Sequence, residues 1–297
     1  MGRVIYGDAL SVIETLDDGS VDTLISDIPY GVNINKSWDK HLPAEDLWNK
    51  CYEKLKPGSH CVIFGQPSMN QALMSVMSNT KFEFRDMWIW QYQGTHTKGI
   101  KLEEGGTTYR SMIRNVYNPI YVFRKKIEGS ELENWKKYRT NLIDIDSVRE
   151  PYQGDHSSIT KAYEKTGKKH TQSNTPSNTF AGLRQKEWLP DPRGREPVNV
   201  KYVPRVDRIE RTINGKVNNK HETVKPIRLM LWLIKMLSRE KQLVLDPFCG
   251  SGTTGCACKL LNRDFICIDN DEVSIEVAIN RIDNILDISD KYKEDIR

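Results

Sequence analysis

Three short segments of the chain carry side chains that could act on a ligand. The first, SDIPY at 26–30, places the carboxylate of Asp27 three residues before the aromatic ring of Tyr30. The second is HETVKP at 221–226, and the third is DPFCGSGTTG at 246–255, which contains a G-x-G-x-x-G spacing. The backbone N–H groups of such a glycine-rich loop can approach a ligand closely. The third segment therefore predicts a binding loop.

The position of this loop predicts a cofactor that contains a nucleoside. The loop lies between an expected strand at 242–246 and an expected helix at 253–262, and Asp269 ends the next expected strand. A carboxylate at that place can hydrogen-bond the hydroxyl groups of a ribose. Nicotinamide dinucleotides and S-adenosylmethionine are both bound in this way, so the glycine spacing alone leaves both open.

The residues directly before the glycines favour S-adenosylmethionine. Asp246 and Phe248 place a carboxylate and an aromatic ring there. A pyrophosphate site has little use for a negative charge, whereas the carboxylate of Asp246 can meet the ammonium group of a methionine moiety. An oxidoreductase with a nicotinamide cofactor is the alternative, but it leaves the segments 26–32 and 221–226 without a role.

The elements that must position these segments alternate between strands and helices. The alternation predicts an α/β fold with a doubly wound, Rossmann-like, mostly parallel sheet, in which ligands bind at the carboxyl ends of the strands. Pro226 is expected at the first helical position of its helix. The expected strands are 21–26, 60–65, 86–92, 118–125, 242–246 and 265–269, and the expected helices are 43–58, 71–78, 225–240, 253–262 and 272–286.

The alternation stops between residues 126 and 220, which are rich in Asn, Thr, Ser, Pro and Lys. The sequence therefore predicts a catalytic, cofactor-binding domain made of 1–125 and 221–297, interrupted by an inserted, irregular region at 126–220. From Arg124 to Lys225 there are 22 lysines and arginines against 14 aspartates and glutamates. Such an excess suggests a polyanionic partner such as nucleic acid, although a solvated loop region has the same composition.

Composition narrows the setting of the protein. The chain has 297 residues, of which 38% are hydrophobic, and no apolar run reaches the roughly 18 residues that a membrane span needs. The first residues do not form a secretion signal. The six cysteines lack the spacing of a zinc site, so no metal is expected. These features predict a cytoplasmic protein with reduced thiols and no membrane partner.

In this order, the three segments resemble the motifs of the β class of amino-methylating DNA methyltransferases. The hallmark of that family is Asp, Asn or Ser followed by Pro-Pro and an aromatic residue, and here it is Asp27-Ile28-Pro29-Tyr30, with Ile28 in place of the usual first proline. The β class has this permuted motif order, with a variable stretch between the first two segments. The resemblance covers about residues 3–125 and 221–286.

The resemblance implies a role for each residue of the hallmark. The carboxylate of Asp27 and the backbone carbonyl of Ile28 would accept the hydrogens of an exocyclic amine, whose nitrogen then attacks the sulfonium methyl directly. Pro29 would stiffen the loop, and Tyr30 would stack on a base extruded from the duplex. The cofactor, S-adenosylmethionine, would be held by Asp8, Thr223, Lys225, Asp246, Phe248, Gly250, Gly252 and Asp269.

By the same resemblance, the protein is a site-specific methyltransferase acting on the N6 amino group of adenine in double-stranded DNA. Family members that act on cytosine usually have Ser where this chain has Asp27. An N4-cytosine enzyme and an inactive DNA-binding homologue are the alternatives. A homodimer and a cognate restriction endonuclease are possible partners. Region 126–220 would recognise the target, with phosphate contacts expected from Lys168, Lys169, Arg184, Arg193, Arg195, Arg205, Arg208 and Arg211.

Overall fold

A computed structural model gives the structure of the protein and describes residues 2–30, 41–94, 99–151, 193–221 and 223–296. The chain divides into two compact units, one made of Met1–Asp144 with Val198–Arg297 and the other of Ile145–Pro197. All three segments with candidate site residues belong to the larger unit. Lys168, Lys169 and Arg184 lie outside the described residues.

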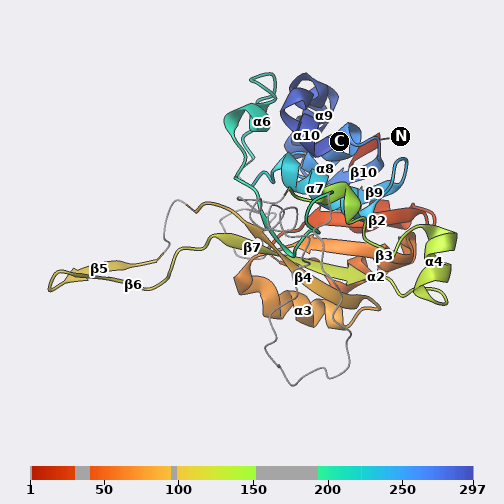
Figure 1. Cartoon of the computed structure of the whole chain (residues 1–297), viewed down its shortest axis with the longest axis horizontal. Helices are drawn as coiled ribbons and strands as arrows, with labels where there is room; N and C mark the ends of the chain where they lie inside the picture. The colour runs from red at the N-terminus through yellow and green to blue at the C-terminus, as the bar shows by residue number, and fades with distance from the viewer. Residues whose placement is uncertain (1, 31–40, 95–98, 152–192, 222, 297) are drawn as a thin grey trace, which may run out of the picture. The chain divides into compact units, whose positions relative to one another are not determined.

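The larger unit is built on an eight-stranded sheet (Figure 1). The strand order is β1-β10-β9-β2-β3-β7-β4-β8, and every neighbouring pair is parallel except those that β7 makes with β3 and β4. The predicted mostly parallel sheet is thus confirmed. The strands are β1 (Gly2–Tyr6), β2 (Val21–Asp27), β3 (Leu55–Phe64), β4 (Glu83–Gln91), β7 (Tyr117–Arg124), β8 (Val200–Tyr202), β9 (Leu243–Asp246) and β10 (Asp264–Asp269).

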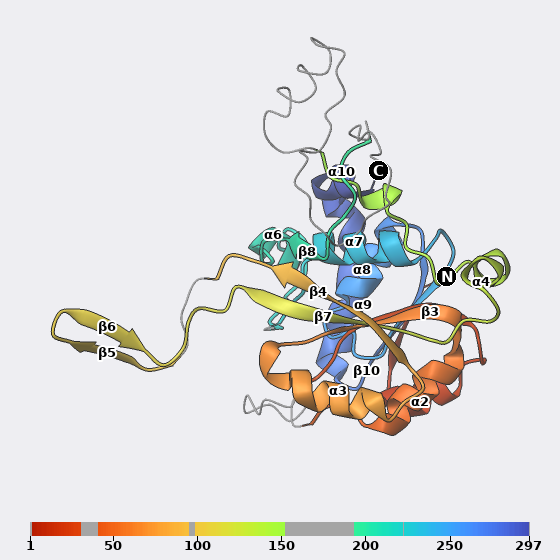
Figure 2. The same cartoon turned by 60° about the horizontal axis from the view of Figure 1, so that its bottom comes forward.

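Helices cover both faces of this sheet. On one face, α1 (Ala9–Glu14), α2 (Glu45–Lys54) and α3 (Asn70–Ser78) pack against one another, and on the other α8 (Thr253–Leu260) packs between α7 (Ile227–Leu237) and α9 (Glu272–Asn284). Figure 2 shows α2 and α3 on one side of the strands and α7 to α9 on the other. Strands between two helical layers are apolar on both sides, as the buried run of β2 shows. The doubly wound arrangement is confirmed.

Several predicted helix boundaries differ from the structure, and two of them concern prolines. The helix expected at 43–58 ends at Lys54, and Leu55 pairs with Val21 instead. Pro57 disfavours a helical backbone at the residue before it, so Leu55 joins the strand despite its helical spacing. Pro226 is the N-cap of α7 and not its first helical residue, with an extended backbone at ψ 133°.

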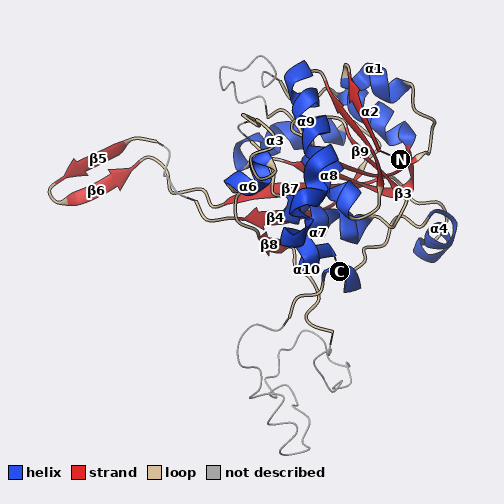
Figure 3. Ribbon diagram, turned by 90° about the horizontal axis from the view of Figure 1, so that it is seen from above, coloured by secondary structure: helices blue, strands red, loops and turns tan. Residues whose placement is uncertain are grey.

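Several elements are not predicted from the sequence. They include the edge strands β1 and β8, the helices α1, α4 (Glu131–Tyr138) and α6 (Arg208–Thr212), and a hairpin of β5 (Lys101–Glu104) with β6 (Thr107–Arg110) that forms its own sheet (Figure 3). Short helical segments are η1 (Pro67–Met69), η2 (Asp146–Val148), η3 (Ile285–Tyr292) and α10 (Lys293–Ile296).

The predicted inserted region does not coincide with the smaller unit. Residues 126–144 and 198–220, including α4, β8 and α6, belong to the larger unit. Within the described ranges, no helix is long and apolar enough to cross a membrane. The same part of the chain contains no group of three or more His, Cys, Asp or Glu side chains that could hold a metal ion.

Candidate active site

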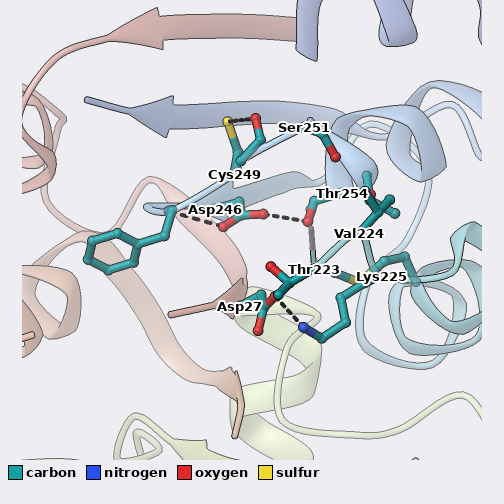
Figure 4. A pocket seen from close by; sticks show the side chains of 12 residues that line it. Asp27, Thr223, Val224, Lys225, Asp246, Cys249, Ser251 and Thr254 are labelled. Atoms are coloured by element: carbon teal, nitrogen blue, oxygen red, sulfur yellow. Dashed lines mark hydrogen bonds and ion pairs between the residues drawn. The ribbon is translucent and has the colours of Figure 1, made fainter. Parts of the chain in front are cut away.

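Three neighbouring strands end in aspartates at the same edge of the sheet. Asp27 ends β2, Asp246 ends β9 and Asp269 ends β10, and these strands are adjacent and parallel. The fold therefore brings together the segments 26–30, 221–226 and 246–255. They surround an open pocket (Figure 4). Its lining residues are Asp27, Thr223, Val224, Lys225, Met230, Asp246, Phe248, Cys249, Gly250, Ser251, Thr253 and Thr254.

Both carboxylate oxygens of Asp27 have partners within the protein. Tyr30 donates its hydroxyl hydrogen to Oδ1 at 2.6 Å, and the ammonium group of Lys225 forms an ion pair with Oδ2. The same ammonium group donates to the Tyr30 hydroxyl at 3.3 Å and lies 5.5 Å from the centre of the Phe64 ring. Only 6% of the Lys225 side chain is exposed, against 20% for Asp27. In Figure 4, Lys225 reaches across the pocket to Asp27.

The departure from the family hallmark, Ile28, has a structural explanation. Its side chain is 3% exposed and belongs to the main hydrophobic core, together with residues such as Leu24 and Ile63. An aliphatic side chain suits this position because it fills core volume. Ile28 still has a backbone carbonyl, the group that the sequence analysis assigns to catalysis.

Asp246 is buried between hydroxyl groups. It accepts hydrogen bonds from the side chain of Ser26 at 2.6 Å, from the backbone N–H of Phe248 at 3.2 Å and from the hydroxyl of Thr254. Burial raises the pKa of Asp246 to about 6, and the negative charge of Asp27 adds to this, while the two hydroxyls oppose it. A cationic ligand in the pocket would favour the ionised form of Asp246.

Asp269 holds the glycine-rich loop through the backbone. Its carboxylate accepts hydrogen bonds from the N–H of Gly250 at 2.8 Å and from the N–H of Asp271 at 3.0 Å. Burial raises the pKa of this carboxyl group. The loop is thereby tied to the carboxyl end of β10.

The fold itself favours glycine at all three positions of the G-x-G-x-x-G spacing. Gly250 and Gly252 have φ angles of 49° and 75°, in the left-handed region that favours glycine. A Cβ atom on Gly252 would lie 2.8 Å from the Cβ of Ala278 in α9, and one on Gly255 would lie 2.4 Å from the Cδ1 of Ile282. Close packing of α8 on α9 thus accounts for two of these glycines, without reference to a ligand.

Segment 221–226 is held at both ends by α6. Arg211 donates to the backbone carbonyl of His221 at 2.7 Å, and the carboxylate of Glu210 accepts from the N–H of Ile227 at 2.6 Å. Glu210 is 5% exposed, and burial raises its pKa. Burial lowers the pKa of His221, so its ring is neutral near pH 7. These contacts fix the stretch that carries Thr223 and Lys225.

Asp8, like Asp269, is not among the residues that line the pocket, although its neighbour Gly7 donates its N–H to the Asp269 backbone carbonyl at 2.9 Å. It follows β1 and caps α1, accepting hydrogen bonds from the N–H and the hydroxyl of Ser11, each at 3.0 Å. Gly252 lies just behind the lining residues, at the start of α8. The roles assigned to these two residues, and to the rest of the predicted set, stay predictions.

Sequence reasoning missed a buried arginine below the loop. Arg281 in α9 is fully buried and donates to the Ser251 carbonyl at 2.6 Å, to the Ser251 hydroxyl at 3.0 Å and to the Thr253 hydroxyl at 3.1 Å. It also missed Ser26 and Thr254, the partners of Asp246. An arginine on the otherwise apolar face of an expected helix is the one signal that points to Arg281.

Comparison with solved structures shows the class of the fold. The M1.HpyAVI–SAM complex matches with a TM-score of 0.52 and 19% identity, over 95% of this chain and all of that one. The PvuII cytosine-N4-specific DNA methyltransferase matches with a TM-score of 0.60 and 16% identity, over 98% of this chain and 92% of that one. The fold is that of S-adenosylmethionine-dependent methyltransferases, as predicted.

Sequence comparison identifies the family. The model of the N6/N4 methyltransferases, described as DNA methylase, matches residues 21–280, so the chain belongs to the DNA methylase family. Similar proteins include the type II methyltransferase M.HindIII of Haemophilus influenzae, 24% identical over 94% of each chain. The DNA adenine methyltransferase YhdJ of Escherichia coli is 27% identical, over 94% of this chain and 82% of its own. The predicted family is confirmed.

Proposed function

We propose that the protein transfers a methyl group from S-adenosylmethionine to the N6 amino group of adenine at specific sites in double-stranded DNA. The observation that carries the proposal is the position of the Asp27 carboxylate on the wall of the pocket that Asp246 and the glycine-rich loop also line. Catalytic and cofactor groups thus face one space, as direct transfer between two bound ligands requires.

The pocket residues fit S-adenosylmethionine by their chemistry. Asp246 offers a buried carboxylate for an ammonium group, and Lys225 and Thr223 offer donors for a carboxylate. Asp269, at the end of β10, is suited to ribose hydroxyls, and Asp8, Phe248, Gly250 and Gly252 complete the proposed set. When bound, S-adenosylmethionine supplies an electrophilic methyl group.

Asp27 can accept from a base while it keeps its present partners. Each of its oxygens accepts from one group, Tyr30 or Lys225, and a carboxylate oxygen has a second lone pair for a target amine. With the Ile28 carbonyl, the carboxylate would accept the amine hydrogens and leave the nitrogen lone pair free. Tyr30 would stack on the extruded base, with Pro29 stiffening the loop.

Adenine is proposed as the base for two reasons. The hallmark begins with Asp27, whereas cytosine-specific members usually begin with Ser. YhdJ, whose name states adenine, matches most of the chain. We extend the proposal to the cytoplasm as the location and to a homodimer and a cognate restriction endonuclease as partners. The similarity to type II methyltransferases supports the endonuclease.

A product analysis tests the proposal. The purified protein is incubated with unmethylated DNA and S-adenosylmethionine, and the DNA is digested to nucleosides for mass spectrometry. We expect N6-methyladenine. N4-methylcytosine would correct the base, and the absence of any methylated nucleoside would contradict the proposal and favour the inactive DNA-binding homologue.

Substitution of Asp27 tests its catalytic role. Asp27→Ala should reduce methyl transfer by at least about a hundredfold, because it removes an electrostatic contact to the reacting group, while S-adenosylmethionine binding persists. Asp18→Ala is the matched control, since Asp18 also pairs with a buried lysine, Lys54, at 2.7 Å, but lies outside the pocket. Equal losses of activity in both variants would contradict the role of Asp27.

A further inference from the structure

The face of the sheet that holds Asp27 continues across four strands. Asp27 is in register with Phe64 of β3, Phe64 with Ile120 of β7, and Ile120 with Trp88 of β4. Residues in register on neighbouring strands point to the same face. Lys225 contacts both Asp27 and the ring of Phe64, so the candidate active site lies on this face.

Two residues further toward the edge of the sheet at which β2 ends, this face carries a second group of side chains with polar atoms. Asn118 of β7 is in register with Trp90 of β4, and Tyr92 follows at the end of that strand. The Tyr92 hydroxyl donates to Asn118 Oδ1 at 2.9 Å, and the Trp90 and Tyr92 rings lie 4.8 Å apart. The guanidinium of Arg205 lies 4.4 Å from the centre of the Tyr92 ring. Trp90, Tyr92, Asn118 and Arg205 are called the Arg205 cluster.

Hydrogen bonds to the backbone of Val203 hold the Arg205 cluster in place. The Trp90 indole donates to the carbonyl of Val203 at 2.9 Å, and the N–H of Val203 donates to the carbonyl of Gln91 at 3.0 Å. Tyr92 is 5% exposed, whereas Arg205 is exposed. The cluster therefore presents a charged group to solvent on a rigid aromatic support.

Arg205 has a charge that the described residues do not neutralise. Within the ranges that the structure describes, no carboxylate lies within ion-pair distance of its guanidinium, whereas Arg193 and Arg195 pair with Asp146 and Glu150. The guanidinium of Arg205 lies beside the Tyr92 ring and keeps N–H groups that can donate to the paired oxygens of a phosphate.

The distance to Asp27 suits a nucleic acid strand. Tyr92, whose ring Arg205 contacts, lies three strands across from Asp27 and about four residues along, which corresponds to roughly 20 Å between Cα atoms for standard sheet spacings. A DNA strand covers this length in about six nucleotides at a rise of about 3.4 Å each. We propose that the Arg205 cluster binds a phosphodiester of the DNA strand whose base enters the Asp27 site, an inference that rests on the proposed function.

Salt dependence of DNA binding tests this proposal. Affinity of the protein for a fluorescent duplex is measured by anisotropy at several salt concentrations. Each neutralised phosphate contributes about 0.9 to the slope of log affinity against log salt. We expect Arg205→Gln to lower the slope by about that amount. Between 50 and 200 mM salt, wild-type affinity should then fall about 3.5 times more than that of the variant.

Arg139→Gln is the matched control. Arg139 is also exposed and its guanidinium lies 5.6 Å from the centre of an aromatic ring, that of Trp135. Its backbone carbonyl accepts a hydrogen bond from the side chain of Gln242, which precedes β9 at the amino edge of the sheet, the edge opposite the pocket. We expect its slope to equal that of the wild type. Arg205→Lys should keep the slope, because the charge stays, and weaken affinity, because the paired donors are lost.

The outcomes separate the proposal from the simpler possibility that Arg205 only covers Tyr92. In that case Arg205→Gln lowers thermal stability and leaves the slope unchanged, which would overturn the proposal. The test also separates it from the proposed function. A wild-type protein that binds DNA without methylating it contradicts the function alone, and the slopes still decide the role of Arg205. A wild-type protein that binds no DNA contradicts both.

Discussion

Replacing Asp246 by Asn should stabilise the protein and weaken its binding of S-adenosylmethionine. Asp246 is 2% exposed, and burial raises the pKa of its carboxyl from 3.8 to about 6. Between these two pH values the folded protein keeps the proton that the unfolded chain releases. The free energy of unfolding therefore falls as the pH rises from about 4 to about 6. Above pH 6 the ionised Asp246 carboxylate lowers the free energy of unfolding by about 3 kcal/mol.

Asparagine removes the charge and can keep the hydrogen bonds. Its Oδ1 can accept from Ser26 and from the N–H of Phe248, as Asp246 does now. Its amide group can donate to the hydroxyl of Thr254, which then acts as the acceptor. At pH 7.5 we expect the variant to be more stable than the wild type by up to about 3 kcal/mol. The difference should fall to about half at pH 5 and to about a fifth at pH 4, where the wild-type carboxyl is protonated in the folded protein.

Urea denaturation without cofactor measures the stability of both proteins at pH 7.5, 5 and 4, and calorimetry measures their affinity for S-adenosylmethionine. The variant should bind the cofactor more weakly, because it lacks the carboxylate proposed to meet the ammonium group. A variant that is less stable at pH 7.5, or a stability difference that does not change with pH, would refute the reasoning. Unchanged affinity would refute the assignment of Asp246 to the cofactor.

Two further substitutions probe the pocket wall and the loop. Lys225→Met should weaken S-adenosylmethionine binding about tenfold or more, because a hydrogen bond to a charged group contributes about 1.5–3 kcal/mol. An unchanged dissociation constant in calorimetry would exclude Lys225 from the cofactor site. Gly252→Ala should lower the free energy of unfolding by more than about 1 kcal/mol, because its φ is 75° and its Cβ would lie 2.9 Å from the Cα of Ala278. Thermal denaturation measures this loss, and Gly105→Ala, with φ 56° and no atom within 4 Å, separates backbone strain from the clash.

The sequence is informative about the site wherever a functional residue ends an apolar strand. Asp27, Asp246 and Asp269 each follow such a run, and a parallel sheet necessarily brings the ends of neighbouring strands to one edge. The sheet class could be predicted for the same reason. Its edges could not, because β1 is partly exposed and β8 has only three residues, so neither carries a long apolar run.

The contacts that tune the site depend on tertiary structure and leave no local pattern. The pairing of β2 with β9 brings the Ser26 hydroxyl to Asp246, and the turn from β9 into α8 brings the Thr254 hydroxyl there. Glu210 caps α7 from a helix of five residues that the sequence analysis places inside an irregular region. Such contacts decide the pKa of a carboxylate and the start of a helix, and they appear only once the chain is folded.

The glycine spacing illustrates how a motif can indicate a fold more strongly than a ligand. Gly252 is required because α8 begins close to the backbone of Ala278 in α9, and Gly255 is favoured by its contact with the Ile282 side chain, whatever the loop binds. Dinucleotide and S-adenosylmethionine proteins share the same strand, loop and helix, so they share the same spacing. The choice between the two ligands depends instead on Asp246, whose buried carboxylate would repel a pyrophosphate and attract an ammonium group. A second carboxylate, that of Asp27, faces the same pocket from the neighbouring strand, and it would add to the repulsion of a pyrophosphate.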